Sequence, residues 1–301
     1  MNGRLVRLLF VCTIFTRLSC SQDFLSVDQI RHKLLFDTSM SENEKDELAI
    51  KMYRANTFCR VFILYPRAVG HEKEIYDIVK KYSTILYEKK VFLTNHGPFH
   101  MIKQFYFDHP WFGDYGDKKD RVAKKAEKTF RHGAELGNPL RVLLLECPND
   151  DYQYFRESKL AIRDIFGTQH VCHSDHRHIT AIRMSQAVFS NPTIEFFNKR
   201  GLNYLPNIEQ ALQDFSIWLK DHKLSKEHIC IVGKSRNAMY GVKDTDIIDF
   251  VCTESFDQEF SLPEQFRNVS NRKKYRAIKE ALVNDHTQHF YHRGFKFAVK
   301  K

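Results

Sequence analysis

A histidine-rich segment carries the first side chains that could do chemistry. It reads Gly167-Thr-Gln-His170-Val-Cys172-His173-Ser-Asp175-His176-Arg-His178, which puts four histidines, one cysteine and one aspartate within nine residues. A neutral imidazole attacks a phosphoryl group when a neighbour fixes its tautomer and cations hold the phosphates. Imidazole and thiolate are also good ligands for zinc or copper. The segment therefore offers either ligands for a metal site, at His170, His173 and His176, or an imidazole nucleophile.

A glycine turn followed by a lone carboxylate forms the second group. An apolar run, 229–232, leads into Gly233-Lys234-Ser235, and Asp249 lies in the next apolar run, 247–250. Glycine lets a phosphate approach the backbone closely, and a carboxylate can hold a divalent cation such as Mg²⁺ or Mn²⁺. The pair Asp244 and Asp246 would add carboxylates only if the strand register slipped by one residue.

The elements expected around the histidine segment alternate between strands and helices. Ser41 and Glu44 have the spacing of a capping box inside a charged helical segment, residues 24–56. Further on, the expected strands are 60–65, 84–94 and 141–146, and the expected helices are 71–82, 99–107, 122–130, 152–166 and 179–189. Strands separated by helices in this order predict a split βαβ, ferredoxin-like sheet, with the histidine segment as a loop beside it.

The rest of the chain predicts a smaller mixed α/β unit. Pro192 and Gly201 indicate a connection over 191–205. After it we expect a helix at 212–220, strands at 228–232 and 247–252, a helix at 272–283 and a last strand at 289–299, with Phe295 and Phe297 on one face. The predicted class is α/β (α+β), with an N-terminal helical segment at 22–57 and two domains at 58–198 and 199–301.

The first domain resembles the nucleoside diphosphate kinases. The residues that carry the resemblance are Tyr65-Pro66-Arg67-Ala-Val69, then Ile162-Arg163-Asp164-Ile165-Phe166-Gly167, then His170-x-x-His173-Ser-Asp175. The resemblance implies a ferredoxin-like fold, His173 as the histidine that carries the phosphoryl group, Arg163 as a phosphate contact, and possible oligomers. Tyr65 stands where the family has its phosphate-binding lysine, and His170 stands where it has an asparagine.

The second domain resembles the nucleotidyltransferases of the polymerase-β type. The passage from Gly233 to Phe250 is similar to their glycine turn, spacer and carboxylate-bearing strand. The resemblance implies that Gly233, Lys234 and Ser235 hold phosphate groups and that Asp249 binds Mg or Mn. Lys234 stands where the family has a second glycine or a serine, and Ile247 stands where it has the first aspartate.

Composition excludes several classes of protein. The 301 residues are 43% hydrophobic and 28% charged, with 12 glycines and 8 prolines, which excludes a disordered or collagen-like chain. The formal net charge is +10, but acidic residues interrupt the basic stretches, so we expect no nucleic-acid partner. No apolar run has the length that a transmembrane helix needs, so no such segment is expected.

The first residues are typical of a secretory signal. Arg4 and Arg7 precede an apolar stretch at 8–15, and small or polar residues follow at 19–21. We expect a signal peptide at 1–21 and a protein that is secreted or lies in the endoplasmic reticulum or Golgi lumen; a buried N-terminal strand is the alternative. In such a compartment Asn268 is a glycosylation site, because Asn268-Val269-Ser270 is an acceptable sequon.

Together these patterns predict a protein that binds a nucleotide or a sugar phosphate, with phosphoryl transfer through His173. Two alternatives remain open on the sequence alone. One is a catalytically inactive binding module whose histidine segment takes up zinc or copper at His170, His173 and His176. The other is nucleotidyl transfer in the C-terminal domain, dependent on Asp249 and a divalent cation.

Overall fold

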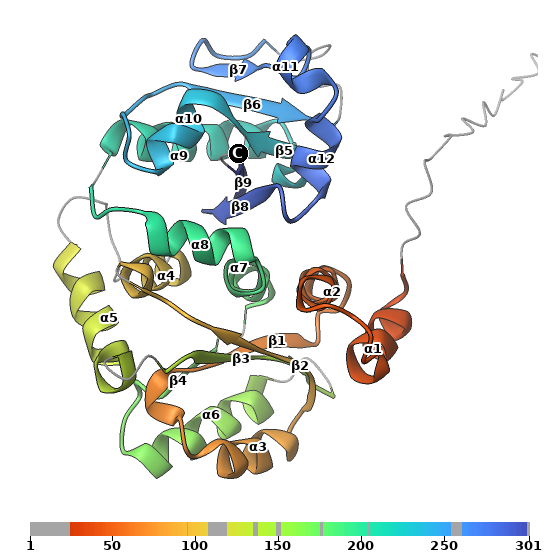
Figure 1. Cartoon of the computed structure of the whole chain (residues 1–301), viewed down its shortest axis with the longest axis vertical. Coiled ribbons are helices and arrows are strands. Elements are labelled where there is room, and N and C mark those ends of the chain that lie inside the picture. Colours follow the sequence, from red (N-terminus) through yellow and green to blue (C-terminus); the bar gives the residue numbers. More distant parts are fainter. Residues whose placement is uncertain are drawn as a thin grey trace, which may run out of the picture.

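The structure of this chain is a computed structural model with a mixed α/β architecture (Figure 1). It describes residues 25–94, 96–107, 119–134, 138–148, 152–174, 177–203, 205–253 and 261–299. The signal peptide predicted at 1–21 and the candidate ligand His176 lie outside the described residues. Two sheets are surrounded and separated by helices, which agrees with the predicted α+β class.

Two capped helices open the described chain, α1 (Val27–Phe36) and α2 (Glu42–Ala55). The predicted capping box is confirmed. The Ser41 hydroxyl accepts a hydrogen bond from the Glu44 N–H at 3.3 Å, and the Glu44 carboxylate accepts one from the Ser41 N–H at 2.8 Å. These contacts satisfy backbone donors that the first helical turn leaves open.

The first sheet has four strands in the order β2-β3-β1-β4. Every neighbouring pair is antiparallel, so β1 and β2 run in the same direction on either side of β3. The elements of this part are β1 (Cys59–Leu64), η1 (Pro66–Ala68), α3 (Glu72–Lys80), β2 (Thr84–Val91), α4 (Gly97–Tyr106), α5 (Lys119–Ala134), β3 (Leu140–Glu146), α6 (Tyr152–Phe166) and β4 (Cys172–Ser174).

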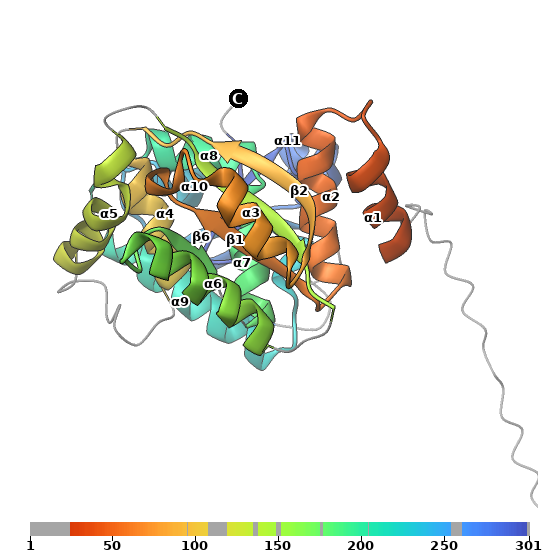
Figure 2. The same ribbon diagram turned by 90° about the horizontal axis from the view of Figure 1, so that it is seen from below.

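Helices cover both faces of this sheet, which explains the unbroken apolar runs 61–64 and 142–145 in its central strands. Phe62 and Leu64 of β1 pack in the cluster that includes α3 and α6, which lie together on one face (Figure 2). Val61 and Ile63 alternate with them and join the cluster that includes α2, α4 and α7 (His178–Val188) on the other face. A strand that is buried on both faces has no alternation of apolar and polar residues, because neither face is exposed to solvent.

The segment 191–199 is a helix, α8 (Asn191–Lys199), and the predicted connection over 191–205 is wrong for these residues. Ser190 caps the helix by accepting a hydrogen bond from the Thr193 N–H, and Pro192 lies in the first turn. Proline fits that turn because the N–H that it lacks would have no partner within the helix. α7 and α8 lie between the two sheets (Figure 1).

The second sheet is mixed, with the strand order β7-β6-β5-β9-β8. Its last two strands form a hairpin, whereas the sequence predicted one strand at 289–299. Arg293 and Gly294 have φ values of 51° and 77° at the turn. The remaining elements are α9 (Pro206–Asp221), η2 (Lys226–His228), β5 (Ile229–Ile231), α10 (Gly233–Met239), β6 (Ile248–Cys252), β7 (Phe266–Asn268), α11 (Lys273–Arg276), α12 (Lys279–Asn284), β8 (His289–His292) and β9 (Phe295–Ala298).

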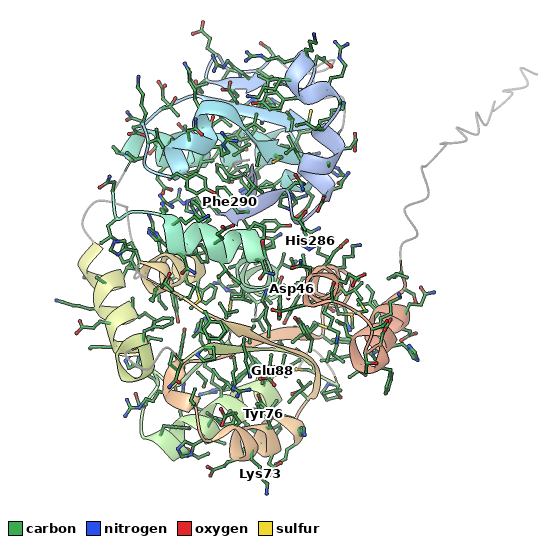
Figure 3. All side chains as sticks on the ribbon, in the orientation of Figure 1. Asp46, Lys73, Tyr76, Glu88, His286 and Phe290 are labelled. Carbon is green, nitrogen blue, oxygen red and sulfur yellow. The ribbon has the colours of Figure 1, made fainter. Side chains whose placement is uncertain are left out.

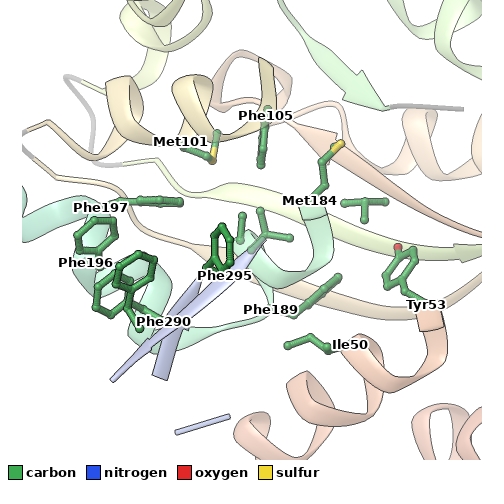
Figure 4. Close-up of a cluster of buried hydrophobic side chains, with 14 of the residues drawn as sticks. Ile50, Tyr53, Met101, Phe105, Met184, Phe189, Phe196, Phe197, Phe290 and Phe295 are labelled. Carbon is green, nitrogen blue, oxygen red and sulfur yellow. The ribbon is translucent and has the colours of Figure 1, made fainter. Parts of the chain in front are cut away.

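One hydrophobic cluster extends through both halves of the molecule (Figure 4). Tyr53 of α2 stacks on Phe189 with ring centroids 6.3 Å apart, and Phe196 of α8 stacks on Phe290 of β8 at 4.1 Å. The predicted domains 58–198 and 199–301 therefore share a core. Phe295 and Phe297 are both buried in this cluster, which confirms that they share a face.

Polar contacts join α2 to both halves, and Figure 3 labels Asp46 and His286. Asp46 pairs with Lys89 of β2, and the Nδ1 atom of His286 lies 3.4 Å from the carboxylate of Glu47.

The described cysteines, Cys59, Cys147, Cys172, Cys230 and Cys252, are buried thiols. Within the described ranges, no helix has the length and apolar character needed to cross a membrane.

Candidate functional site

His173 lies in the short edge strand β4, not in the loop that the sequence predicted. Its register partner is Ile63 of β1, and its side chain is 8% exposed. The imidazole stacks on Phe105 of α4 with ring centroids 5.9 Å apart, and its Nδ1 atom is 2.8 Å from the Tyr106 hydroxyl. The end of α4 therefore fixes the orientation of this ring.

The contact with Tyr106 can also fix the tautomer of His173. When the phenol oxygen accepts the Nδ1 proton, the lone pair of the imidazole is at Nε2. The ammonium group of Lys125 lies over the Tyr106 ring, 4.8 Å from its centroid. The same tyrosine therefore contacts both the imidazole of His173 and a cation.

Four cations lie near enough to His170, in the loop between α6 and β4, for their charges to act on its pKa. They are Lys125 and Lys128 of α5, Arg163 of α6 and Arg67 of η1. Burial lowers the pKa of His170 first, and these four charges lower it further. A proton on His170 would add a fifth positive charge, so the neutral ring is favoured and the cluster is suited to an anion.

Two buried donors lie in the same region as these four cations, and one of them belongs to Arg163. The Tyr65 hydroxyl and the Arg163 Nε atom have no hydrogen-bond partner among the described residues. Burial raises the pKa of Tyr65 well above its usual value and raises the pKa of Cys172 to about 11, and in both cases the Arg163 charge opposes the shift. Tyr65 and Cys172 are therefore neutral, and the two buried donors could bind ligand oxygens.

The described residues provide no set of ligands for the zinc or copper site that is the alternative use of the histidine segment. Within them, no group of three or more histidine, cysteine or carboxylate side chains could hold a metal ion. His170 lies among four cations, which repel a metal cation. His173 faces α4, and His176 lies outside the described residues, so a zinc or copper site there remains a prediction.

The second group of candidate residues is brought together at the start of α10. Gly233 has a φ of 64°, and a Cβ atom there would be 3.0 Å from Asp249 Oδ2, so this position favours glycine. The Ser235 hydroxyl donates to the Ile247 carbonyl and accepts from the Asp249 N–H, both at 2.8 Å. The side chain of Lys234 is exposed.

Arg267 pairs with the carboxylate at which the sequence predicted a divalent cation. It is the register partner of Asp249 in the parallel strand β7. Its Nε and Nη2 atoms lie 2.8 and 2.7 Å from Asp249 Oδ1. No sequence pattern indicates this pair, because β7 is only three residues long and shows no periodicity. Asp244 is also occupied, since its carboxylate accepts the Asn207 and Ile208 N–H groups at the start of α9.

We expect Arg267→Asp to create a divalent-cation site that the unmodified protein lacks. The substitution places two carboxylates on adjacent parallel strands and removes the guanidinium that neutralises Asp249. Calorimetric titration with Mn²⁺ should show one saturable site in Arg267→Asp only. Arg272→Asp makes the same change of charge at an exposed position and should bind no Mn²⁺. Mn²⁺ binding to the unmodified protein that disappears in Asp249→Asn would contradict the prediction.

The candidate glycosylation site, Asn268, is half-buried in β7. Its Nδ2 atom donates to the Cys252 sulfur at 3.2 Å, and its Oδ1 atom accepts from the Ser270 hydroxyl at 2.6 Å. A glycan attached to Nδ2 would have to displace Cys252 from this contact. Glycosylation of Asn268 remains a prediction.

Comparison with known proteins adds no assignment. No protein-family profile matches the chain, and no curated protein is significantly similar to it.

Proposed function

We propose that this protein binds a phosphorylated small molecule, a nucleotide or a sugar phosphate, beside His173 and transfers a phosphoryl group through that histidine. The observation that carries the proposal is the convergence of Arg67, Lys125, Lys128 and Arg163 on His170, three positions from His173 along the chain. Convergent cations from separate elements are what the binding of a polyphosphate needs.

The arrangement of the first sheet supports the ferredoxin-like, nucleoside-diphosphate-kinase-like interpretation of 58–198. β1 and β2 run in the same direction with β3 between them, which is the split βαβ arrangement. The candidate nucleophile lies on β4, next to β1, where α4 can orient it. Arg163, which the resemblance implies as a phosphate contact, is one of the four cations.

In the proposed reaction, Nε2 of His173 attacks the terminal phosphorus of the nucleotide. The N–P bond forms as the P–O bond to the leaving diphosphate breaks, and an acceptor oxygen later takes the phosphoryl group from the histidine. Tyr106 holds the Nδ1 proton, while Arg163 and Lys125 offset the charge on the transferring group. The groups around His170 are cationic, so a Mg²⁺ or Mn²⁺ ion would have to be held by the nucleotide's own phosphates.

Labelling with ATP that carries ³²P at the γ-phosphate tests the chemistry. We expect acid-labile label on the unmodified protein and none on His173→Asn, which should still bind nucleotide. Tyr106→Phe should label more slowly at unchanged affinity, because it removes only the partner of Nδ1. Equal labelling of His173→Asn would end the assignment, and binding without label would favour the inactive binding module.

The binding itself is tested by Arg163→Gln, which we expect to weaken nucleotide binding at least about tenfold, since a charge-assisted hydrogen bond contributes about 1.5–3 kcal/mol. Arg156→Gln on the same helix removes an exposed arginine and serves as the matched control. Isothermal titration with ADP measures both. Equal affinities of the two variants would count against the cation cluster as the binding site.

For 199–301, we infer a nucleotidyltransferase-like unit in which Asp249 is neutralised by Arg267. The glycine turn at 233 and its close approach to Asp249 support the likeness, and the ion pair disfavours two-metal catalysis at that carboxylate. Secretion or a luminal location is proposed on the residues at 4–21.

A further inference from the structure

A buried carboxylate at the junction of the two halves is shared among four basic side chains. Glu209 of α9 has a side chain that is 2% exposed. Its oxygens are 3.4 Å from Lys103 of α4, 3.3 Å from Arg200, 3.4 Å from His292 and 3.3 Å from Arg293. All four distances exceed the 2.7–2.9 Å of a charge-assisted hydrogen bond. One carboxylate therefore serves several basic side chains and forms a close contact with none of them.

The same face of α4 presents two buried polar atoms without partners. His100, Lys103 and Gln104 are three and four residues apart, so they lie on one side of the helix. The His100 Nδ1 atom and the Gln104 Nε2 atom have no hydrogen-bond partner among the described residues, and these residues are 4% and 3% exposed. Gln104 Oε1 accepts from the Arg293 N–H at 3.2 Å, which places the amide beside the cations.

The protonation of His100 restricts the kind of ligand that could satisfy both atoms. Its Nε2 atom is 3.1 Å from the Arg200 carbonyl oxygen. A carbonyl only accepts, so Nε2 carries the proton and Nδ1 of the neutral ring is an acceptor. Gln104 Nε2 is a donor. A ligand here must offer a hydrogen to His100 and an anionic oxygen to Gln104 and the cations.

We propose that this junction binds inorganic hydrogen phosphate, between His100 and Gln104 of α4 and the guanidinium groups of Arg200 and Arg293. Hydrogen phosphate carries both a P–O–H donor and anionic oxygens at neutral pH, whereas sulfate carries no donor. Arg200 and Arg293 reach the site from the end of α8 and from the β8–β9 turn, so the ion links both halves to α4. The site is independent of the proposed nucleotide site.

Titration of the full chain with inorganic phosphate at constant ionic strength tests the proposal. The measurements use an Arg163→Gln background, which weakens phosphate binding at the proposed nucleotide site. We expect one calorimetric binding event in this background, and sulfate should bind at least about tenfold more weakly because it cannot donate to His100. Sulfate that binds as tightly as phosphate would overturn the assignment.

Gln104→Glu is the decisive variant. It keeps the size and the acceptor for Arg293, adds a charge that the neighbouring cations stabilise, and replaces the donor with a carboxylate oxygen that repels phosphate. We expect phosphate affinity to fall at least about tenfold in the Arg163→Gln background. In a chain that keeps Arg163, Gln104→Glu should leave ³²P labelling of His173 unchanged. Gln213→Glu on α9 makes the same change at an exposed position and should not alter phosphate affinity. Unchanged phosphate binding in Gln104→Glu would overturn the proposal, because the ion would then bind at another place.

Discussion

Lowering the pH from 7 to 5 should destabilise the folded protein by about 4–5 kcal/mol. Burial is the largest cause that lowers the pKa of His100 to about 2, of His289 to about 3 and of His292 to about 4. The ordinary pKa of histidine is 6.5, so below that pH the unfolded chain binds protons that the folded chain does not bind. The contribution of these three histidines to the free energy of unfolding is therefore fully present above pH 6.5 and is lost as the pH falls.

The magnitude follows from linkage. Each of the three histidines costs about 2 kcal/mol between pH 7 and pH 5. Asp46 opposes them. Burial raises its pKa to about 6, so as the pH falls the folded chain binds this proton at a higher pH than the unfolded chain does. Protonation of Asp46 therefore stabilises the folded protein by about 1 kcal/mol between pH 7 and pH 5. The net loss is a large part of the 5–15 kcal/mol that stabilises an ordinary protein.

Urea unfolding in chloride buffers at several pH values measures this loss. His289→Gln removes one of the three groups and should reduce the loss between pH 7 and pH 5 by about 2 kcal/mol. His32→Gln removes an exposed histidine of α1 and should leave the pH dependence unchanged. A free energy of unfolding that is equal at pH 7 and pH 5 would refute the explanation.

Lys89→Met should destabilise the protein by about 3–5 kcal/mol, because it leaves a buried carboxylate without its cation. The side chains of Lys89 and Asp46 are each 1% exposed and form an ion pair. Lys89 also donates to Asn191 Oδ1 at 2.7 Å, and the Tyr87 hydroxyl donates to Asp46 at 3.1 Å. The pair thus joins α2, β2 and α8.

The double variant Asp46→Leu/Lys89→Met distinguishes the loss of the whole ion pair from the burial of one charge without its partner. It removes both charges, so we expect it to be more stable than either single variant at pH 7 in urea unfolding. Lys199→Met breaks an exposed pair with Glu195, whose side chains are 64% and 56% exposed, and should cost less than about 1 kcal/mol. Equal losses for Lys89→Met and Lys199→Met would show that burial does not control the effect.

Local patterns predicted the elements whose signals lie within a few residues of each other. The Ser41–Glu44 box marked the start of α2, and the apolar runs marked β1 and β3. The pattern failed where a signal had two meanings or was too short. Pro192 indicates a connection by its type, although it lies in the first turn of α8. The three residues of β4 are too few to show alternation.

The sequence by itself identified His173, Arg163 and Asp249 as residues of interest, because their neighbours along the chain form recognisable patterns. Only the tertiary structure decided what surrounds them: Tyr106 beside His173, the four cations around His170, and Arg267 paired with Asp249. The physical reason is distance along the chain. Helical and strand periodicity links residues up to four positions apart. Tyr106 and Arg267 lie 67 and 18 residues from His173 and Asp249, and they meet only when the sheets pair and the helices pack between them.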